Sequence, residues 1–161
     1  MNDVALRRAG PADAAAVRAL ARLAFAKWVP VIGREPTPMT ADYEQAVREH
    51  RIDLVEIEGT LAALIEMIPK PDHVLIETLA VAPEFQGRGL GTRLLAHAEA
   101  VAVEAGHDTL RLYTNQEFTE NIALYRRRGY AIESEAPFLG GISVLMAKPL
   151  SRTATTPSCP R

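Results

Sequence analysis

Cysteine is nearly absent from this chain. Of its 161 residues one is a cysteine, Cys159, and it lies close to the C-terminal end. A single thiol cannot close an internal disulfide or build a thiolate metal cluster. The histidines lack a paired spacing such as HExxH, so we expect surface or hydrogen-bonded residues; they are His50, His73, His97 and His107. The sequence therefore predicts no metal site.

An excess of one charge and long apolar runs are also missing. There are 18 basic and 20 acidic residues, a net charge of -2, and the longest basic run is the triplet 126–128. This balance argues against a general nucleic-acid-binding protein, and the triplet suits the last turn of a helix. No apolar run approaches the ~20 residues that span a bilayer, and the N-terminus lacks a signal-peptide pattern. We expect a soluble, cytoplasmic protein with no membrane and no nucleic-acid partner.

The length of the chain limits the number of domains. A chain of 161 residues suits one domain, which buries about two-thirds of its unfolded surface. The end of the chain, 151–161, is rich in Ser, Thr and Pro and poor in bulky apolar residues. That composition is typical of disorder. We expect one domain over residues 1–150 and a disordered tail over 151–161.

The most informative stretch is Gln86–Gly91, with the sequence Gln-Gly-Arg-Gly-Leu-Gly. It joins an apolar run, Val74–Ala82, to an amphipathic run, Leu90–Ala105. Glycines at alternate positions let a backbone approach a ligand closely and turn its amides toward one point. At a helix N-terminus such amides favour a phosphate or pyrophosphate, which predicts a nucleotide-like cofactor. The alternative is a turn that only lets strand and helix pack.

The glycine spacing excludes two common phosphate motifs. A P-loop has Lys and then Ser or Thr after its last glycine, whereas Gly91 is followed by Thr92 and Arg93. A dinucleotide fingerprint reads G-x-G-x-x-G, with an acidic residue about 20 positions later, whereas this loop reads G-x-G-x-G. A protein that binds ATP or NAD is therefore disfavoured.

Hydrophobic periodicity and turn residues predict a mixed α/β fold, with a largely antiparallel sheet flanked by helices. Strands are expected at 4–6, 54–57, 61–68, 74–81, 109–113, 130–133 and 142–147. Helices are expected at 11–26, 41–51, 90–105 and 119–128. Prolines and Gly33 break any long helix between 28 and 40, and 137–141 is expected to be a loop.

Two segments carry a resemblance to a known family. Gln86–Gly91 is similar to the Q/R-x-x-G-x-G/A loop of the GNAT superfamily of acyl-CoA-dependent N-acyltransferases, and 81–85 resembles that family's strand exit. Leu124–Tyr130, with the sequence Leu-Tyr-Arg-Arg-Arg-Gly-Tyr, resembles the family's L-Y-x-x-x-G-F/Y helix end. The likeness runs from Val4 to about Leu150. It implies a GNAT-like fold and an N-acetyltransferase that moves the acetyl group of acetyl-CoA to a primary amine of a small molecule or peptide.

The resemblance also implies which residues hold acetyl-CoA. The pantetheine arm would pair like an extra strand beside Leu79, Ala80 and Val81, whose amides would also polarise the thioester carbonyl. Contacts to the pyrophosphate and its surroundings fall on Gln86, Gly87, Arg88, Gly89, Leu90, Gly91 and Thr92. Many relatives have an Asn seven residues before the family's tyrosine, where this chain has Phe118. Asn121, from the next helical turn, is expected to replace that contact, and no metal is implied.

Acetyl transfer from a thioester to an amine needs a base for the amine. Glu77 is the first candidate, because it is the only charge in the apolar strand 74–81. A half-buried carboxylate there would have its pKa raised into a useful range. The alternatives are that Glu77 points to solvent or pairs with an arginine, and that ordered water is the base. Glu66 and His73 are weaker candidates, because their places near a strand end or turn predict exposure.

The departing thiolate needs a proton, and Tyr125 matches the family's tyrosine. Its phenol has an ordinary pKa of about 10, close to that of an alkyl thiol, so the transfer is nearly balanced. Core packing on one helical face with Ile122 is the structural alternative. Because Cys159 lies in the tail, a covalent acyl-cysteine is not expected, and both substrates should react by direct attack.

The acceptor side is the least specified part of the sequence. By resemblance it is lined by the segment 28–43 and the loop 137–141. Trp28 and Tyr43, with Glu35 and Asp42, would form an aromatic and acidic pocket for a cationic amine, or else a solvated surface with one anchoring Trp. The competing function is a non-catalytic acyl-CoA-binding sensor. A homodimer is expected from the family alone.

Overall fold

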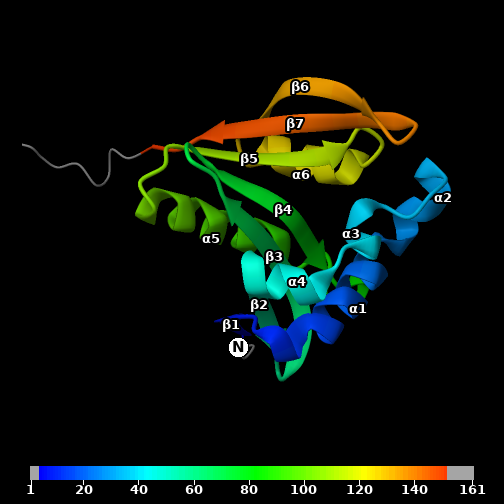
Figure 1. Ribbon diagram of the computed structural model, residues 1–161, viewed down its shortest axis with the longest axis vertical. Helices are drawn as coiled ribbons and strands as arrows, with labels where there is room; N and C mark the ends of the chain where they lie inside the picture. The colour runs from blue at the N-terminus through cyan, green and yellow to red at the C-terminus, as the bar shows by residue number, and fades with distance from the viewer. Residues whose placement is uncertain (1–3, 152–161) are drawn as a thin grey trace, which may run out of the picture. The chain divides into compact units, whose positions relative to one another are not determined.

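The structure, a computed structural model, describes residues 4–151, and Figure 1 shows its ribbon. The expected disordered tail lies outside the described residues, except for Ser151. The chain divides into two compact units. One contains the residues up to Ile68 together with Ile76–Leu94, and the other contains Pro69–Leu75 together with the residues from Leu95 on.

The first unit holds the N-terminal strands and helices (Figure 1). Its strands are β1 (Val4–Arg8), β2 (Arg51–Ile57), most of β3 (Thr60–Pro69) and most of β4 (Val74–Val81). Between β1 and β2 come η1 (Pro11–Asp13), α1 (Ala14–Phe25), η2 (Ala26–Trp28), α2 (Val29–Ile32), α3 (Thr37–Thr40) and α4 (Tyr43–Glu49). After β4 come η3 (Pro83–Phe85) and the start of α5 (Leu90–Glu104).

The second unit holds the rest of α5, then β5 (Thr109–Asn115), α6 (Thr119–Arg127), β6 (Ala131–Phe138) and β7 (Gly141–Pro149). The described strands form one sheet with the order β1-β2-β3-β4-β5-β7-β6. The pairs β1–β2, β2–β3, β5–β7 and β6–β7 are antiparallel. The mixed α/β fold with a largely antiparallel sheet is therefore confirmed.

The burial of β3 explains its long apolar run. It has a neighbouring strand on both sides, and its positions 62–67 are all buried. Its largest fully buried side chains are Leu64, Ile65 and Met67, and in the paired strand β2 Ile52 and Leu54 are also fully buried, with Leu54 directly opposite Leu64. Full burial of such a side chain contributes about 1.5–3 kcal/mol. The first unit is thus held together chiefly by apolar packing around these two strands.

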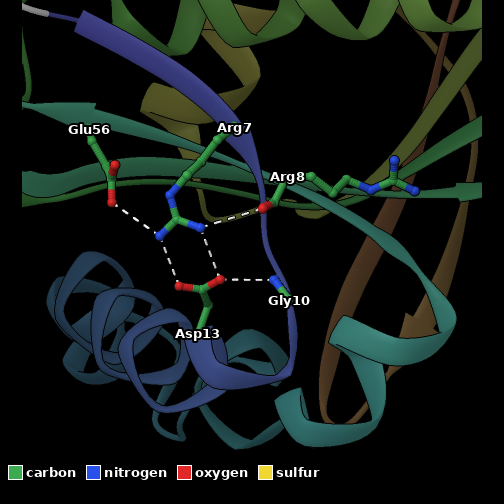
Figure 2. Close-up of polar contacts among 5 residues, drawn as sticks. All are labelled: Arg7, Arg8, Gly10, Asp13 and Glu56. Carbon is green, nitrogen blue, oxygen red and sulfur yellow. Dashed lines mark hydrogen bonds and ion pairs between the residues drawn. The ribbon is translucent and has the colours of Figure 1, made fainter.

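Arg7 ties β1 to the first helical turn and to β2 (Figure 2). Its Nη1 and Nη2 donate to the two oxygens of Asp13 at 3.0 and 2.9 Å, and Nη2 also donates to Glu56 Oε2 at 3.1 Å. Asp13 accepts a further hydrogen bond from the Gly10 amide at 2.8 Å. One guanidinium therefore joins three elements at the start of the described chain.

The helix expected at 41–51 is shorter than predicted. Asp42 caps α4 by accepting a hydrogen bond from the Gln45 amide at 3.1 Å, so the helix begins at Tyr43. At the other end Arg51 already belongs to β2, where it is paired with Met67 of β3. Arg51, which the helical pattern included, is therefore paired in the sheet instead.

The final hairpin is longer than predicted. β6 continues through Pro137 to Phe138 and β7 starts at Gly141, so the expected loop 137–141 shrinks to Leu139 and Gly140. Both turn residues have positive φ, +48° and +83°. β6 is last in the strand order, and edge strands are the part of a sheet that tolerates proline. Between 28 and 40 only short helical turns occur, as expected.

Among residues 4–151 no helix is both long and apolar enough to cross a membrane. No group of three or more metal-ligating side chains is found within the same residues. The domain boundary at residue 150 stays a prediction.

Candidate functional site

The segment after β4 folds back on the strand it leaves. Gln86 Nε2 donates to the carbonyl oxygen of Val81 at 3.1 Å, and the Arg88 guanidinium lies over the Phe85 ring at 5.0 Å. Phe85 itself is buried, at 8% exposure, and anchors η3. These contacts fix where the glycine-rich turn begins, while the turn itself, 86–89, is exposed.

The glycines of the turn are required by backbone conformation. Gly87 and Gly89 have φ of +81° and +80°, which L side chains rarely adopt, and a Cβ at either position would meet nothing within 4 Å. Gly91 already lies in α5. The first amides of a helix have no intrahelical acceptor, and here they follow two left-handed glycines in open space. Backbone amides with that exposure fit an anionic group such as a pyrophosphate.

The strand that leads into this turn has the residues expected to pair with a pantetheine arm. Leu79 and Val81 are half-buried, and Ala80 between them is buried at 2% exposure. At the strand exit the Ala82 amide donates to the Ala62 carbonyl oxygen at 2.8 Å, which keeps β4 in the sheet up to the turn. All the predicted cofactor-binding residues from 79 to 92 therefore lie in the first unit, along one continuous path of the chain.

Glu77 lies on β4 with an exposed side chain. The expectation of a half-buried carboxylate was wrong: its strand neighbours Ile76 and Thr78 are buried, whereas Glu77 points the other way by the two-residue alternation of a strand. Exposure keeps the carboxylate reachable by a substrate.

Tyr125 lies on α6 in the second unit and is buried, at 6% exposure. Its ring centroid is 5.9 Å from that of Tyr130, with the planes tilted by 60°, so the ring packs in the interior against an aromatic residue beyond α6. Burial raises the pKa of the Tyr125 phenol above its ordinary value. The phenol therefore stays protonated, although it is a weaker acid than a solvated tyrosine.

Phe118, which stands where the family resemblance implies an asparagine, and its expected replacement Asn121 both lie at the start of α6. Phe118 precedes the helix and is buried at 6% exposure, so it acts as an apolar anchor. Asn121 is half-buried in the first turn of the helix. Its role as the replacement contact stays a prediction.

Trp28 and Tyr43 are core residues of the first unit. Trp28 is 7% exposed and has the Lys27 ammonium 5.2 Å from its ring centroid, so one ring face already meets a cation of this chain. Tyr43 is 2% exposed, and its hydroxyl donates to the Pro38 carbonyl oxygen at 2.6 Å. Burial raises the pKa of the Tyr43 phenol, with the charge of Glu66 as the next cause.

The acidic residues of the expected acceptor pocket have partners within the chain. Glu35 forms an ion pair with Arg22 at 2.8 Å, which holds the pKa of that carboxyl below its usual range. Asp42 is the cap of α4. The aromatic rings of this segment are buried, whereas Glu35 and Asp42 are exposed, which agrees with the alternative of a solvated surface anchored by Trp28. A role of these residues in binding the amine stays a prediction.

Sequence reasoning misplaced Glu66. It was expected to be exposed near a strand end, but it is 3% exposed in the middle of the buried run of β3. His50 Nδ1 lies 2.7 Å from Glu66 Oε2, and Thr78 Oγ1 donates to Glu66 Oε1 at 3.0 Å. The sequence does contain a sign of this burial. Glu66 is a single charge with apolar residues on both sides, and such a charge inside an apolar run predicts a buried group with hydrogen-bond partners. His73, the other weak candidate, contacts Asp72 at 2.7 Å.

Solved acetyltransferase structures share this fold. A structure of the paia N-acetyltransferase from Thermoplasma acidophilum in complex with coenzyme A has a TM-score of 0.78 at 18% identity, over 91% of this chain and 99% of that chain. The profile of the acetyltransferase (GNAT) family matches residues 16–130, more than half of the chain. The chain therefore belongs to the acetyltransferase (GNAT) family.

Curated relatives match parts of the chain. A spermidine N(1)-acetyltransferase from Escherichia coli K12 is 32% identical over 90 residues, which cover 51% of this chain and 46% of the relative. A mycothiol acetyltransferase from Clavibacter sepedonicus is 40% identical over 75 residues, 47% of this chain and 25% of the relative. The chain thus spans less than half the length of these relatives.

Proposed function

We propose that this protein is an N-acetyltransferase that moves the acetyl group of acetyl-CoA to a primary amine of a small molecule or peptide. The observation that carries the proposal is the turn between β4 and α5, where Gly87 and Gly89 hold left-handed backbone in open space at a helix N-terminus. Membership of the acetyltransferase (GNAT) family supports the choice of an acyl-CoA over other pyrophosphate ligands.

Acetyl-CoA supplies an activated thioester and is consumed as a co-substrate. Residues 79–81 of β4 would hold its pantetheine arm, and residues 86–92 with Asn121 its remaining parts. Arg88 adds a cation to the turn, since its guanidinium rests on Phe85 with an exposed side chain. Peptide amides of Leu79, Ala80 and Val81 would stabilise the oxyanion, because fixed donors cost no reorganisation when the charge develops.

The amine must lose a proton before it attacks, and Glu77 is the proposed acceptor of that proton. Its exposed carboxylate on β4 is reachable by a solvated ammonium group. Tyr125 is the proposed donor to the departing thiolate, because burial keeps its phenol protonated. The two groups act on different atoms of the reactants, so each can be removed separately by mutation.

A cationic amine is the acceptor class that we favour. One curated relative is described as a spermidine N(1)-acetyltransferase, and Glu77 gives this chain an exposed carboxylate on β4. Trp28 and Tyr43 would then shape the acceptor side from the core by holding the segment 28–43, rather than by stacking on the amine. The cytoplasmic location and the homodimer remain predictions.

Calorimetric titration with acetyl-CoA, CoA, ATP and NAD tests the proposal first. We expect selective micromolar binding of acetyl-CoA and CoA, followed by amine-dependent release of thiol in a screen that includes spermidine and small peptides. A preference for ATP or NAD would refute the assignment of the turn. Binding of acetyl-CoA without thiol release by any amine would favour the non-catalytic sensor.

A further inference from the structure

One segment of the first unit has little apolar packing to hold it in place. It consists of residues 29–40, which contain α2 and α3 and follow α1 in Figure 1; we call it the strap. Of these residues, all of which the structure describes, Pro36 and Met39 are the buried ones. The four residues of α2, Val-Pro-Val-Ile, are all apolar, yet none of them is buried. Segments with few buried apolar contacts open locally at a low cost in free energy.

Prolines make the strap stiff. Pro30, Pro36 and Pro38 each have a fixed φ and also restrict the residue that precedes them. Half of the strap therefore has a restricted backbone. We expect a segment of this stiffness to leave its neighbours as one piece rather than residue by residue.

Arg22 of α1 holds the strap at two points. Its guanidinium donates to both carboxylate oxygens of Glu35, at 3.3 and 2.8 Å. Its Nη1 also donates to the carbonyl oxygen of Met39 at 2.8 Å. The bond to Met39 is partly buried and has a charged donor, which makes it stronger than a bond between neutral groups. One side chain of α1 thus joins the linker between α2 and α3 to the end of α3.

The ion pair in this arrangement is open to solvent. The side chains of Arg22 and Glu35 are 39% and 40% exposed. Exposed pairs of this kind contribute about 0–1 kcal/mol, and salt weakens them. The hold of α1 on the linker is therefore weak and depends on ionic strength.

Tyr43 of α4 supplies a further anchor. Its hydroxyl donates to the carbonyl oxygen of Pro38 at 2.6 Å. Removal of the Arg22 side chain leaves this bond and the burial of Pro36 and Met39 in place. The strap should then be loosened without the unfolding of α1 or α4.

We propose that the strap opens as one unit and that Arg22 is the latch that keeps it closed on α1. Opening breaks the bonds from Arg22 to Glu35 and to the Met39 carbonyl oxygen, while α1 and α4 stay folded. The opening becomes easier as the ionic strength rises, because the latch includes an exposed ion pair. The proposal goes beyond the proposed function and does not depend on it, since no substrate takes part.

Hydrogen exchange of the full chain without ligands tests the proposal. Two amides of the strap report on it: the Gly33 amide donates to the Val29 carbonyl oxygen at 2.8 Å, and the Met39 amide donates to the Pro36 carbonyl oxygen at 2.9 Å. The Gly33 bond lies within α2, away from the two residues that Arg22 bonds. A change at Gly33 therefore measures opening of the whole strap. Amides of the buried strand β3 provide the reference in each sample.

Three variants separate the parts of the latch. Arg22→Ala removes both bonds, whereas Glu35→Gln removes the charge of the ion pair and keeps the bond to the Met39 carbonyl oxygen. The matched control is Arg18→Ala, because Arg18 lies one turn earlier on α1 and lowers the pKa of Glu35 only through its charge. Each variant is measured at about 0.1 M and about 1 M salt, where the screening length is about 10 and about 3 Å.

We expect the exchange rates of the Gly33 and Met39 amides to rise together in Arg22→Ala, by about 10- to 100-fold, the factor that a hydrogen bond from a charged group contributes to an opening equilibrium. Glu35→Gln should raise both rates by about 2- to 5-fold. High salt should do the same to the wild type and have no such effect on Glu35→Gln. Arg18→Ala should leave both rates within about 2-fold of the wild type.

Three results would overturn the proposal. A rise confined to the Met39 amide would show that Arg22 holds one bond and that the strap does not open as a unit. Unchanged rates in Arg22→Ala would remove the latch, and an equal rise in Arg18→Ala would assign the effect to the charge of α1. Should Arg22→Ala also speed exchange in β3, Glu35→Gln and the salt series still decide, since they leave the bond to the Met39 carbonyl oxygen intact.

Discussion

The carboxylate of Asp13 accepts hydrogen bonds from both Arg7 and Gly10 near the start of the described chain. Arg7 lowers its pKa first through paired hydrogen bonds, and the Gly10 amide adds to this, so the pKa falls to about 2. An aspartate in an unfolded chain has a pKa of about 3.9. The stabilisation is therefore fully present above that value and is lost as the pH falls through about 2.

We expect Asp13→Asn to destabilise the protein at pH 7 by about 1 kcal/mol or less, because the partner Arg7 is exposed and solvent screens the pair. The difference in melting temperature from the wild type should shrink as the pH is lowered from about 5 to about 2. Thermal melts at several pH values measure this. Glu104→Gln, at an exposed position of α5, is the control. A difference that stays constant with pH would contradict the assignment.

Tyr125 is the second residue whose removal gives a sharp result. Tyr125→Phe keeps the ring that contacts Tyr130 and removes only the hydroxyl. An enzyme that uses this phenol as its acid should lose about 10- to 1000-fold in kcat, with the affinity for acetyl-CoA nearly unchanged. Because burial raises the pKa of the phenol, no alkaline loss of activity from Tyr125 is expected below pH about 10.

Tyr113→Phe on β5 is the control for that measurement, since Tyr113 is 58% exposed. Steady-state kinetics and calorimetry on the two variants give the comparison. Equal turnover by Tyr125→Phe and Tyr113→Phe would remove the acid role from Tyr125 and leave it only its packing role.

For single residues, the sequence predicted burial correctly in some cases and wrongly in others. Tyr125 was identified by a motif, and its burial followed from its place on a helical face. Glu77 and Glu66 were misjudged in opposite directions, since the first is exposed and the second is buried. Which face of a strand meets a helix is decided by packing between distant segments, and alternation alone leaves both phases open.

Among the elements, the turn before α5 makes the strongest demand on its sequence. Gly89 and Gly106 lie at opposite ends of that helix, with φ of +80° and +89°, and a Cβ at either would meet nothing within 4 Å. Alanine at either position therefore costs only backbone strain, about 1–2 kcal/mol. The pair allows the strain to be separated from ligand binding.

We expect Gly89→Ala and Gly106→Ala to lower stability by similar amounts, whereas only Gly89→Ala should weaken acetyl-CoA binding, by about 10-fold or more. Relief of the strain would turn the amides after position 89 away from a bound anion, and 1.4 kcal/mol corresponds to a factor of 10. Denaturant melts and calorimetry provide the two readouts. Equal loss of affinity in both variants would mean that the turn acts only through the stability of α5.

The boundaries of elements show what local patterns predict and where they stop. Periodicity predicts the long helix α5 and the glycine that ends it. The structure agrees, since Gly106 follows the helix with a left-handed φ. The β6–β7 hairpin is longer than predicted. From sequence alone Pro137 indicates a loop, because the sequence does not show that β6 is an edge strand. Edge strands tolerate proline, and strand order is a property of the whole chain.

For the molecule as a whole, ligand binding and folding are linked. A ligand that binds only the folded protein stabilises it by about 2.7 kcal/mol at 100 times its dissociation constant. In a protein of this size each kcal/mol raises the melting temperature by about 2–4 °C. We therefore expect saturating acetyl-CoA to raise the melting temperature by about 5–10 °C, and CoA to act similarly.

ATP and NAD should cause little change, because the G-x-G-x-G turn lacks the residues that P-loops and dinucleotide folds place around their phosphates. Gly89→Ala should show a reduced shift with acetyl-CoA, and Gly106→Ala the full shift despite its lower starting temperature. A shift with ATP as large as that with acetyl-CoA would mean that the turn recognises a pyrophosphate without the pantetheine arm. The role of Leu79, Ala80 and Val81 beside that arm would then be lost, since only the arm distinguishes the two ligands along β4.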